Sequence, residues 1–291
     1  MAHDGTTGAV KLDPQLGERV RGVAAGLGGM SADGLEITRP ELLDARRTGE
    51  IGLVHSWELV TAVDGPGTRM TVFLSGCPLR CMFCHNPDTM GMKEGTLERV
   101  EEVAKRVIRY RRIFAASGGG LTLSGGEPLF QIAFTRRLLE MVHAADIHTA
   151  IDTSGYLGSR LNDEDLDNID LVLLDIKSGD ESTYKRVTSR ELQPTIDFGD
   201  RLNAMGKKVW IRFVVVPGLT DSPDNVARVA DIAGRWTSNV ERVEVLPFHN
   251  MGADKWKKIG LPYELEGLSP PAPHVVERVR ETFRSRGLEV F

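Results

Sequence analysis

The chain has 291 residues, of which 41% are hydrophobic and 26% are charged, and its formal net charge is −5. This mildly acidic balance disfavours a nucleic-acid partner, because nucleic-acid binding usually requires a basic face or stripe. The sequence contains no apolar run of the roughly 18 residues that a membrane span requires and no charged-then-apolar signal at its start, so we expect a cytoplasmic protein without a membrane partner.

Residues 1–50 differ in composition from the residues that follow. They are rich in glycine and contain no aromatic side chain, and only the stretch 39–47 is typical of a short helix, with Pro40 in its first turn. We therefore expect a flexible N-terminal extension over residues 1–50 and one domain over residues 51–291.

From residue 51 onward, short apolar runs alternate with amphipathic helical periods. Strands are predicted over 71–76, 120–126, 148–155, 170–178, 208–218 and 240–250, and helices over 97–114, 130–146, 159–169, 224–236 and 273–287. Apolar strands that alternate with helices indicate an α/β fold with a parallel sheet covered by helices. About six such units fit a doubly wound sheet or an incomplete β/α barrel, and in both folds ligands bind at the carboxyl ends of the strands.

All three cysteines of the chain, Cys77, Cys81 and Cys84, follow the first of these strands. Clustered cysteines in a reducing compartment indicate metal binding or catalysis. Three thiolates can hold a [4Fe–4S] cluster with one iron left open, whereas electron carriers normally use four cysteines. A zinc site would need His85 as its fourth ligand, although structural zinc sites usually consist of two separated ligand pairs. A redox disulfide is the remaining alternative, but its usual motif is Cys-x-x-Cys.

Further candidate residues lie at the ends of the later strands. "SGGEP" (124–128) combines two glycines, which let a ligand approach the backbone, with a carboxylate. Asp152, Asp175, Lys177 and His249 end three other strands. An isolated acid or histidine at a strand end usually has a capping or structural role. Here all four residues fall on the edge where a parallel sheet binds its ligands, which favours a shared site.

The segment "CPLRCMFCHN" resembles the signature of the radical S-adenosylmethionine (SAM) superfamily. The resemblance implies an incomplete (β/α)6 TIM-like barrel, a [4Fe–4S] cluster on the three cysteines, and SAM bound at the open iron. It also implies cleavage of SAM to a 5′-deoxyadenosyl radical, a chemistry that the cofactors supply and the protein orients. The implied SAM contacts are Phe83, His85, Asn86, Gly125, Gly126, Glu127, Asp175, Ile176, Lys177 and His249, and Asp152 and Thr153 match a site that can hold a small monovalent cation.

The similarity extends beyond the superfamily signature. "DGPGTR", "ASGGGLTLSGGEPL", "DLVLLDIKS" and "VEVLPFHNMGADKW" occur in the order found in pyruvate formate-lyase-activating enzymes. That family removes an α-hydrogen from one backbone glycine of pyruvate formate-lyase, a glycyl-radical enzyme, and the resemblance implies flavodoxin or ferredoxin as electron donor. Many activating enzymes of other glycyl-radical enzymes carry an inserted ferredoxin-like segment with more cysteines, for which this chain has too few.

Two other functions stay open on the sequence alone. A radical SAM enzyme could act on another glycyl-radical enzyme or on a small molecule. A protein of a different class, a Cys3His zinc-stabilised binding module, would use the three cysteines together with His85.

Overall fold

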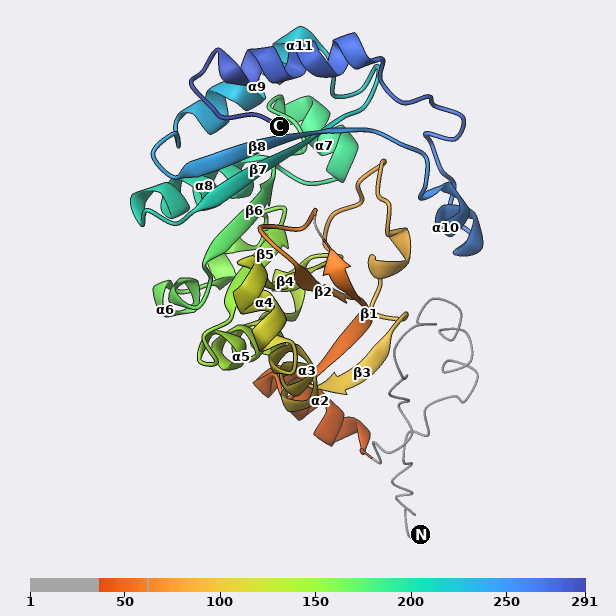
Figure 1. Ribbon diagram of the computed structural model, residues 1–291. Coiled ribbons are helices and arrows are strands. Elements are labelled where there is room, and N and C mark those ends of the chain that lie inside the picture. Colours follow the sequence, from red (N-terminus) through yellow and green to blue (C-terminus); the bar gives the residue numbers. More distant parts are fainter. Residues whose placement is uncertain (1–36, 62) are drawn as a thin grey trace.

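The structure is a computed structural model, and it describes residues 37–61 and 63–291 (Figure 1). The part of the expected N-terminal extension that precedes residue 37 lies outside these residues, and the domain boundary at residue 50 stays a prediction. The helix expected near Pro40 is present as α2 (Arg39–Thr48). Thr38 and Glu41 form a reciprocal capping box at its start, which satisfies two backbone donors that a helix start leaves free.

Within the described residues, a curved sheet of eight strands forms the centre of the fold, in the order β3-β1-β2-β4-β5-β6-β7-β8 (Figure 1). Neighbouring strands run parallel from β2 to β8. These parallel strands are β2 (Arg69–Leu74), β4 (Gly120–Gly125), β5 (His148–Thr153), β6 (Leu171–Asp175), β7 (Val209–Val215) and β8 (Val240–Pro247). In the described part of the chain β3 and β8 are the sheet edges, so the barrel is open and the predicted α/β class and incomplete (β/α)6 barrel are confirmed.

Two strands extend the sheet in the antiparallel direction and were not predicted. They are β1 (Ile51–Thr61), which pairs with β2, and β3 (Thr96–Arg99), which pairs with β1. The predicted helix over 97–114 was therefore wrong at its start, since residues 96–99 pair with residues 51–54. Its remainder forms two helices, α3 (Val100–Ile108) and α4 (Arg111–Ser117), because the chain turns between them and buries Phe114.

Helices cover the outer face of the sheet, whereas the inner face opens toward α10 (Figure 1). The longer connections carry α5 (Ile132–His143), α6 (Asp163–Asp167), α7 (Glu181–Thr188), α8 (Gln193–Ala204), α9 (Pro223–Gly234), α10 (Ala253–Lys258) and α11 (Pro273–Arg284). Short 3-10 turns follow the ends of strands or their loops, namely η1 (Pro87–Thr89), η2 (Pro128–Gln131) and η3 (Gly158–Arg160). Among the described residues, no helix is long and apolar enough to cross a membrane.

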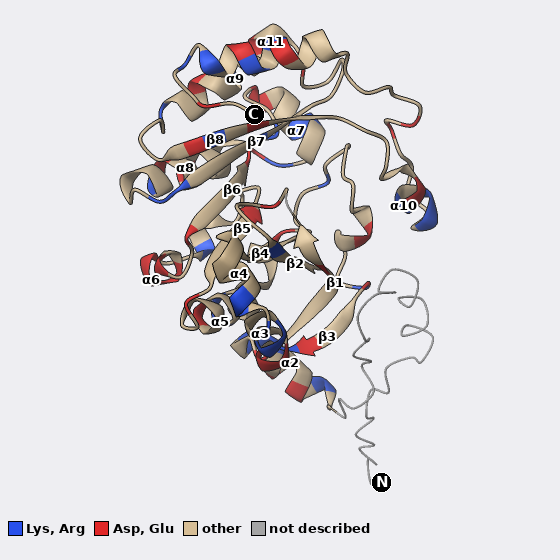
Figure 2. Cartoon of the chain, in the orientation of Figure 1, with Lys and Arg blue, Asp and Glu red and all other residues tan. Residues whose placement is uncertain are grey.

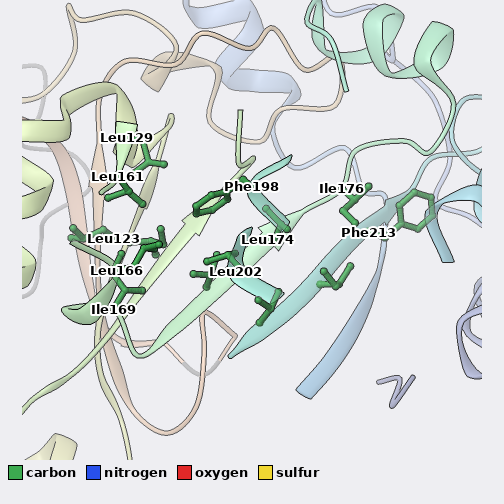
Figure 3. Packing of buried hydrophobic residues seen from close by; sticks show 14 of the residues in the cluster. Leu123, Leu129, Leu161, Leu166, Ile169, Leu174, Ile176, Phe198, Leu202 and Phe213 are labelled. Atoms are coloured by element: carbon green, nitrogen blue, oxygen red, sulfur yellow. The ribbon is translucent and has the colours of Figure 1, made fainter. Parts of the chain in front are cut away.

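The main hydrophobic core lies between the sheet and these helices. Leu123, Leu174 and Phe213 project from their strands into this layer, where they join Phe198 and Leu202 of α8 (Figure 3). Because side chains alternate along a strand, the residues between them face the interior of the barrel. The outer face of the strands therefore supplies the main hydrophobic core, and the inner face carries the residues that reach the site.

Candidate active site

A cavity of about 520 Å³ lies at the carboxyl ends of the parallel strands. The loops after β2, β4, β5, β6 and β8 supply its walls, and β7 supplies its floor. This is the edge at which an α/β barrel binds its ligands. The predicted site residues that line it are Cys77, Cys81, Phe83, Cys84, His85, Asn86, Gly125, Gly126, Asp152, Asp175, Lys177 and His249.

The cysteine loop, which we define as residues 75–86, is fixed in place by backbone hydrogen bonds to the end of α7. The amide of Arg80 donates to the carbonyl of Thr188 at 2.8 Å, and the amide of Met82 donates to the carbonyl of Val187 at 3.0 Å. Loops usually vary in position because few of their backbone groups are paired. These bonds give the three thiols a defined position on one side of the cavity.

Two aromatic side chains complete the attachment of this loop. Phe83 is 4% exposed and packs with Val187, Val216 and Phe248 in a small apolar cluster. The indole of Trp256 on α10 donates a hydrogen bond of 2.9 Å to the carbonyl of Cys84. The aromatic residue before the third cysteine is therefore an anchor of the loop as well as part of the cavity wall.

The three thiols are free and partly accessible, and burial raises the pKa of each one. For Cys81 the pKa rises to about 12. Cysteine binds a metal as the thiolate, so metal binding at this site must release the thiol protons. The positive charge of the metal then stabilises the buried thiolates. Among residues 37–61 and 63–291, no three His, Cys, Asp or Glu side chains converge as one metal ion requires. Three thiols on one cavity wall suit an iron–sulfur cluster, in which each thiolate binds a different iron.

Gly125 and Gly126 form the wall next to the cysteine loop. Gly125 has a φ of +114°, and a Cβ there would lie 2.3 Å from the backbone nitrogen of Leu74. A Cβ on Gly126 would lie 2.5 Å from the carbonyl oxygen of Gly76. Only glycine fits both positions, so the backbone itself faces the cavity and can approach a ligand closely.

Glu127, which follows these glycines, does not line the cavity. It is 1% exposed, and its carboxylate accepts hydrogen bonds from the hydroxyls of Thr153 and Ser154, at 2.7 and 2.6 Å, and from the amides of Ser154 and Leu129. Burial raises the pKa of Glu127, although these hydrogen bonds oppose the rise. The structure thus places Glu127 and Thr153 behind the wall, where they join the loops after β4 and β5.

A pair of opposite charges lies at the end of β6. The ammonium of Lys177 is 2.7 Å from a carboxylate oxygen of Asp175 and 5.7 Å from the ring centre of Phe83. Burial lowers the pKa of Lys177, but the Asp175 carboxylate and the nearby Cys81 outweigh it, and the net direction is upward. Ile176 between them is fully buried in the outer core and does not line the cavity.

The floor of the cavity contains a cation that the sequence analysis did not single out. Arg212 on β7 lies 3.1 Å from Asp152 and 3.3 Å from Glu244, with Asp64 at 3.8 Å. The signal that could have revealed it is a single charge within the apolar strand "VWIRFVVV", because a charge inside a buried strand requires partners. Asp64 belongs to "DGPGTR", so this motif contributes to the same charged group.

Asp152 has one carboxylate oxygen engaged and one free. Its Oδ2 accepts from the hydroxyl of Ser124 at 2.8 Å and pairs with Arg212, while Oδ1 is buried without a hydrogen-bond partner among the described residues. Buried polar atoms are normally satisfied. Oδ1 of Asp152 is therefore an acceptor at the cavity wall that is open to a ligand or an ion.

His85 and His249 meet at the other side of the cavity. Their rings stack with centroids 3.9 Å apart, and Nε2 of His85 is buried with no hydrogen-bond partner in the described structure. Burial and then the neighbouring His249 lower the pKa of His85 to about 4, so this ring is neutral at pH 7. Asn86 is fixed by Lys255, whose ammonium donates to its side-chain oxygen at 2.6 Å.

Comparison with known proteins agrees with this geometry. Residues 71–230 match the model of the radical SAM superfamily. The pyruvate formate-lyase-activating enzyme of Clostridium pasteurianum is 45% identical over 218 residues, which cover 75% of this chain and 91% of that protein. The chain belongs to this family of radical SAM enzymes. The pyruvate formate-lyase 1-activating enzyme of Escherichia coli K12 is 39% identical, with 82% of this chain and 98% of that protein covered.

Solved structures agree on the fold. A radical SAM methyltransferase from Sphaerobacter thermophilus aligns with a TM-score of 0.55 at 16% identity, over 88% of this chain and 81% of that one. Streptococcus suis SuiB, bound to its precursor peptide SuiA, gives a TM-score of 0.57 at 17% identity, over 94% of this chain and 58% of that one. At such identities the likeness concerns the architecture alone.

Radical SAM enzymes use a [4Fe–4S] cluster and SAM, and the residues of the cavity fit both. Three thiols line one wall, and the adjoining wall is bare glycine backbone. The charged groups of the lining include the unsatisfied Oδ1 of Asp152 and the Lys177–Asp175 pair. Since SAM carries an ammonium, a carboxylate and a sulfonium, a cavity with both signs of charge suits it.

Proposed function

We propose that this enzyme generates a glycyl radical in pyruvate formate-lyase. When the cluster and SAM are bound, one-electron reduction of SAM supplies a 5′-deoxyadenosyl radical that removes an α-hydrogen from a backbone glycine of the partner. The observation that carries the proposal is one cavity that contains all three cysteines, the two bare glycines and the charged wall, in a chain with these relatives.

Each wall of the cavity has a role in this proposal. Cys77, Cys81 and Cys84 hold the cluster, and Gly125 and Gly126 admit the methionine part of SAM close to their backbone. The Asp175–Lys177 pair orients the ribose and the carboxylate of SAM. Phe83, His85, Asn86 and His249 line the adenosine side, while Glu127 and Ile176 act from behind the wall by fixing the loops.

We also propose that Asp152 and Thr153 contribute to a monovalent cation site beside the carboxylate of SAM. The free Oδ1 of Asp152 supports this role. The hydroxyl of Thr153 already donates to Glu127, so a cation would use the lone pairs that remain on its oxygen.

A protein substrate is favoured over a small molecule by the rim of the cavity. Val63 lines the cavity and is 68% exposed, and Met251, two residues after the cavity-lining His249, is 78% exposed. These two side chains supply apolar area at the rim that a docked protein would cover. An open barrel gives a glycine-bearing loop a route to the bound SAM.

The reaction needs a reductant and an environment that keeps the cluster intact. We propose a low-potential donor protein, flavodoxin or ferredoxin, and a cytoplasmic location, where thiols are kept reduced and available to the cluster.

The test is anaerobic reconstitution with iron and sulfide, followed by reduction and addition of SAM and pyruvate formate-lyase. We expect a brown protein, one 5′-deoxyadenosine for each radical formed, and a glycyl doublet in the electron paramagnetic resonance spectrum of the partner. Cys81→Ser is the control and should lose both the cluster and SAM cleavage. SAM cleavage without a radical in pyruvate formate-lyase would point to a different substrate, and a colourless zinc protein would refute the radical chemistry altogether.

A further inference from the structure

Seven cationic side chains surround the outer side of the cysteine loop. They come from the loop itself, from the end of α7 and the residues after it, and from α10, much of whose ribbon has the blue colour of Lys and Arg in Figure 2. We call this group the basic collar, and its members are Arg80, Lys185, Arg186, Arg190, Lys255, Lys257 and Lys258.

The collar contrasts in charge with the rest of the chain. Residues 77–90, 181–191 and 251–260 contain these seven Lys and Arg residues and four Asp and Glu residues, a formal net charge of +3. The whole chain has a net charge of −5. Residues 99–112, on β3, α3 and α4, are also basic, with six Lys and Arg residues and two Glu residues. An acidic partner attracted to the collar, in contrast, is placed next to the cysteine loop, and this attraction directs its encounter.

The collar belongs to the outside of the protein and not to the cavity. None of its seven side chains lines the cavity. Five of them, including Lys185, Arg186, Lys257 and Lys258, are exposed. Charges that served only to bind SAM would instead point inward, as Lys177 does.

The elements that carry the collar contact the backbone of the cysteine loop directly. Arg190 donates to the carbonyl of Pro78 at 2.8 Å, and the side chain of Arg80 donates to the carbonyl of Cys77 at 2.7 Å. On α10, Trp256 donates to the carbonyl of Cys84, and a Cβ on Gly252 would lie only 2.9 Å from that same oxygen. A protein docked on the collar is thus separated from the cysteine loop by a single layer of structure.

We propose that the basic collar is the docking surface for an acidic one-electron carrier protein, an inference that rests on the proposed function. In each turnover the carrier is oxidised by one electron and SAM is reduced by one electron. The S–C5′ bond of SAM breaks to give methionine and the 5′-deoxyadenosyl radical. The mouth of the cavity must admit the partner's glycine, so the electron enters from the opposite side of the cysteine loop.

The test compares a protein donor with a small reductant that needs no docking surface. The variants are Lys257→Glu with Lys258→Glu, and Lys185→Glu with Arg186→Glu, all at exposed positions outside the cavity. The matched control is Arg109→Glu with Arg112→Glu, which makes the same charge change at the ends of α3 and α4. Flavodoxin hydroquinone is the protein donor, and photoreduced 5-deazariboflavin is the small one.

We expect each collar variant to lower the rate of flavodoxin-driven SAM cleavage about tenfold at low ionic strength. This loss should shrink as salt rises, because salt screens exposed charges. The rate with deazariboflavin and the rates of the control variant should stay at the wild-type value. If the wild type and all variants cleave SAM at the same rate with flavodoxin, the collar is not the docking surface. If the wild type cleaves no SAM with either reductant, the proposed function is wrong instead.

Discussion

Two layers of the barrel interior follow one another along β5, β6 and β7 and differ in their chemistry. The upper layer, nearer the carboxyl ends, consists of Asp152, Asp175, Arg212 and Glu244. The lower layer contains Ala150, Leu171, Leu173 and Trp210, which form a separate buried apolar cluster. Because both layers occupy the inward face of the pleat, the position along the strand, and not the face, separates binding from stability.

The difference between the layers follows from what each one faces. The upper layer borders the cavity, so its charges pair with one another and keep one oxygen of Asp152 free. The lower layer closes the bottom of the barrel. Even its charged neighbour Arg242 is stacked, with its guanidinium 4.5 Å from the ring centre of Trp210 and 3.7 Å from that of Phe291. A barrel interior is filled by such layers of side chains. Of these two layers, only the upper one contributes residues to the cavity.

The largest effect is expected where the upper layer depends on one cation. Arg212→Leu removes the ion-pair partner of the buried Asp152 carboxylate and leaves Glu244 with Arg242, at 3.6 Å. Breaking a buried ion pair in this way costs about 3–5 kcal/mol. Urea denaturation should show this loss in the free energy of unfolding. The double variant Arg212→Leu with Glu244→Gln should regain part of it. A loss below about 1 kcal/mol is typical of exposed ion pairs. It would show that the upper layer is solvated, and would contradict its description as a buried charged layer.

In the lower layer, truncation should reduce stability and leave the site intact. Leu173 is fully buried, and Leu173→Ala should lower the free energy of unfolding by about 2–5 kcal/mol, since it removes buried methyl groups and leaves a cavity. The affinity of the reconstituted enzyme for SAM, measured by titration well below the melting temperature, should stay at the wild-type value. A fall in SAM affinity would mean that the two layers are mechanically coupled.

Replacement of Lys177 should have the opposite effect, because it should weaken SAM binding and leave the cluster in place. Lys177→Ala removes the ammonium that pairs with Asp175, and we expect the Kd for SAM to rise about tenfold to a hundredfold, roughly 1.4 kcal/mol for each factor of ten. The absorbance of the cluster should persist because no ligand is lost. Lys177→Arg keeps the positive charge and should recover much of the affinity. Loss of the cluster in Lys177→Ala would instead assign this residue to the cysteine loop.

The sequence predicted the six parallel strands and the edge that carries the site. Alternation of strands and helices is a local pattern, and the predicted strand ends by themselves placed Cys77, Asp175 and His249 at one edge of the sheet. The resemblance to a known family then supplied the cofactors. Both inferences depend on the order of residues along the chain, which a sequence shows directly.

Other features depend on contacts between distant segments. The strand at residues 96–99 follows from its pairing with residues 51–54, which overrides the helical period of its own sequence. Arg212 joins the site because Asp64, Asp152 and Glu244 come to it from three other parts of the chain. Glu127 likewise lies behind the cavity wall because the hydroxyls of Thr153 and Ser154, at the end of β5, bind its carboxylate.

The smallest effect concerns a histidine at the lower end of the barrel, His148, whose Nδ1 lies 3.3 Å from Arg69. Burial lowers its pKa, Arg69 and Lys208 lower it further, and Asp170 opposes them. The folded state therefore binds fewer protons than the unfolded chain, whose histidine titrates near pH 6.5. The stability that this histidine contributes is complete above about pH 6.5 and is lost as the pH falls below that value.

Replacement of this histidine should flatten the acid side of the stability curve. Urea denaturation of the wild type between pH 7 and pH 5 should show a falling free energy of unfolding, and His148→Asn should show a shallower fall. The side-chain oxygen of asparagine can still accept a hydrogen bond from Arg69, so stability at pH 7 should change little. Identical slopes would mean that the imidazole titrates equally in both states. Because His148 lies outside the cavity, SAM affinity at pH 7 should not respond, and the lower end of the barrel would then affect stability alone.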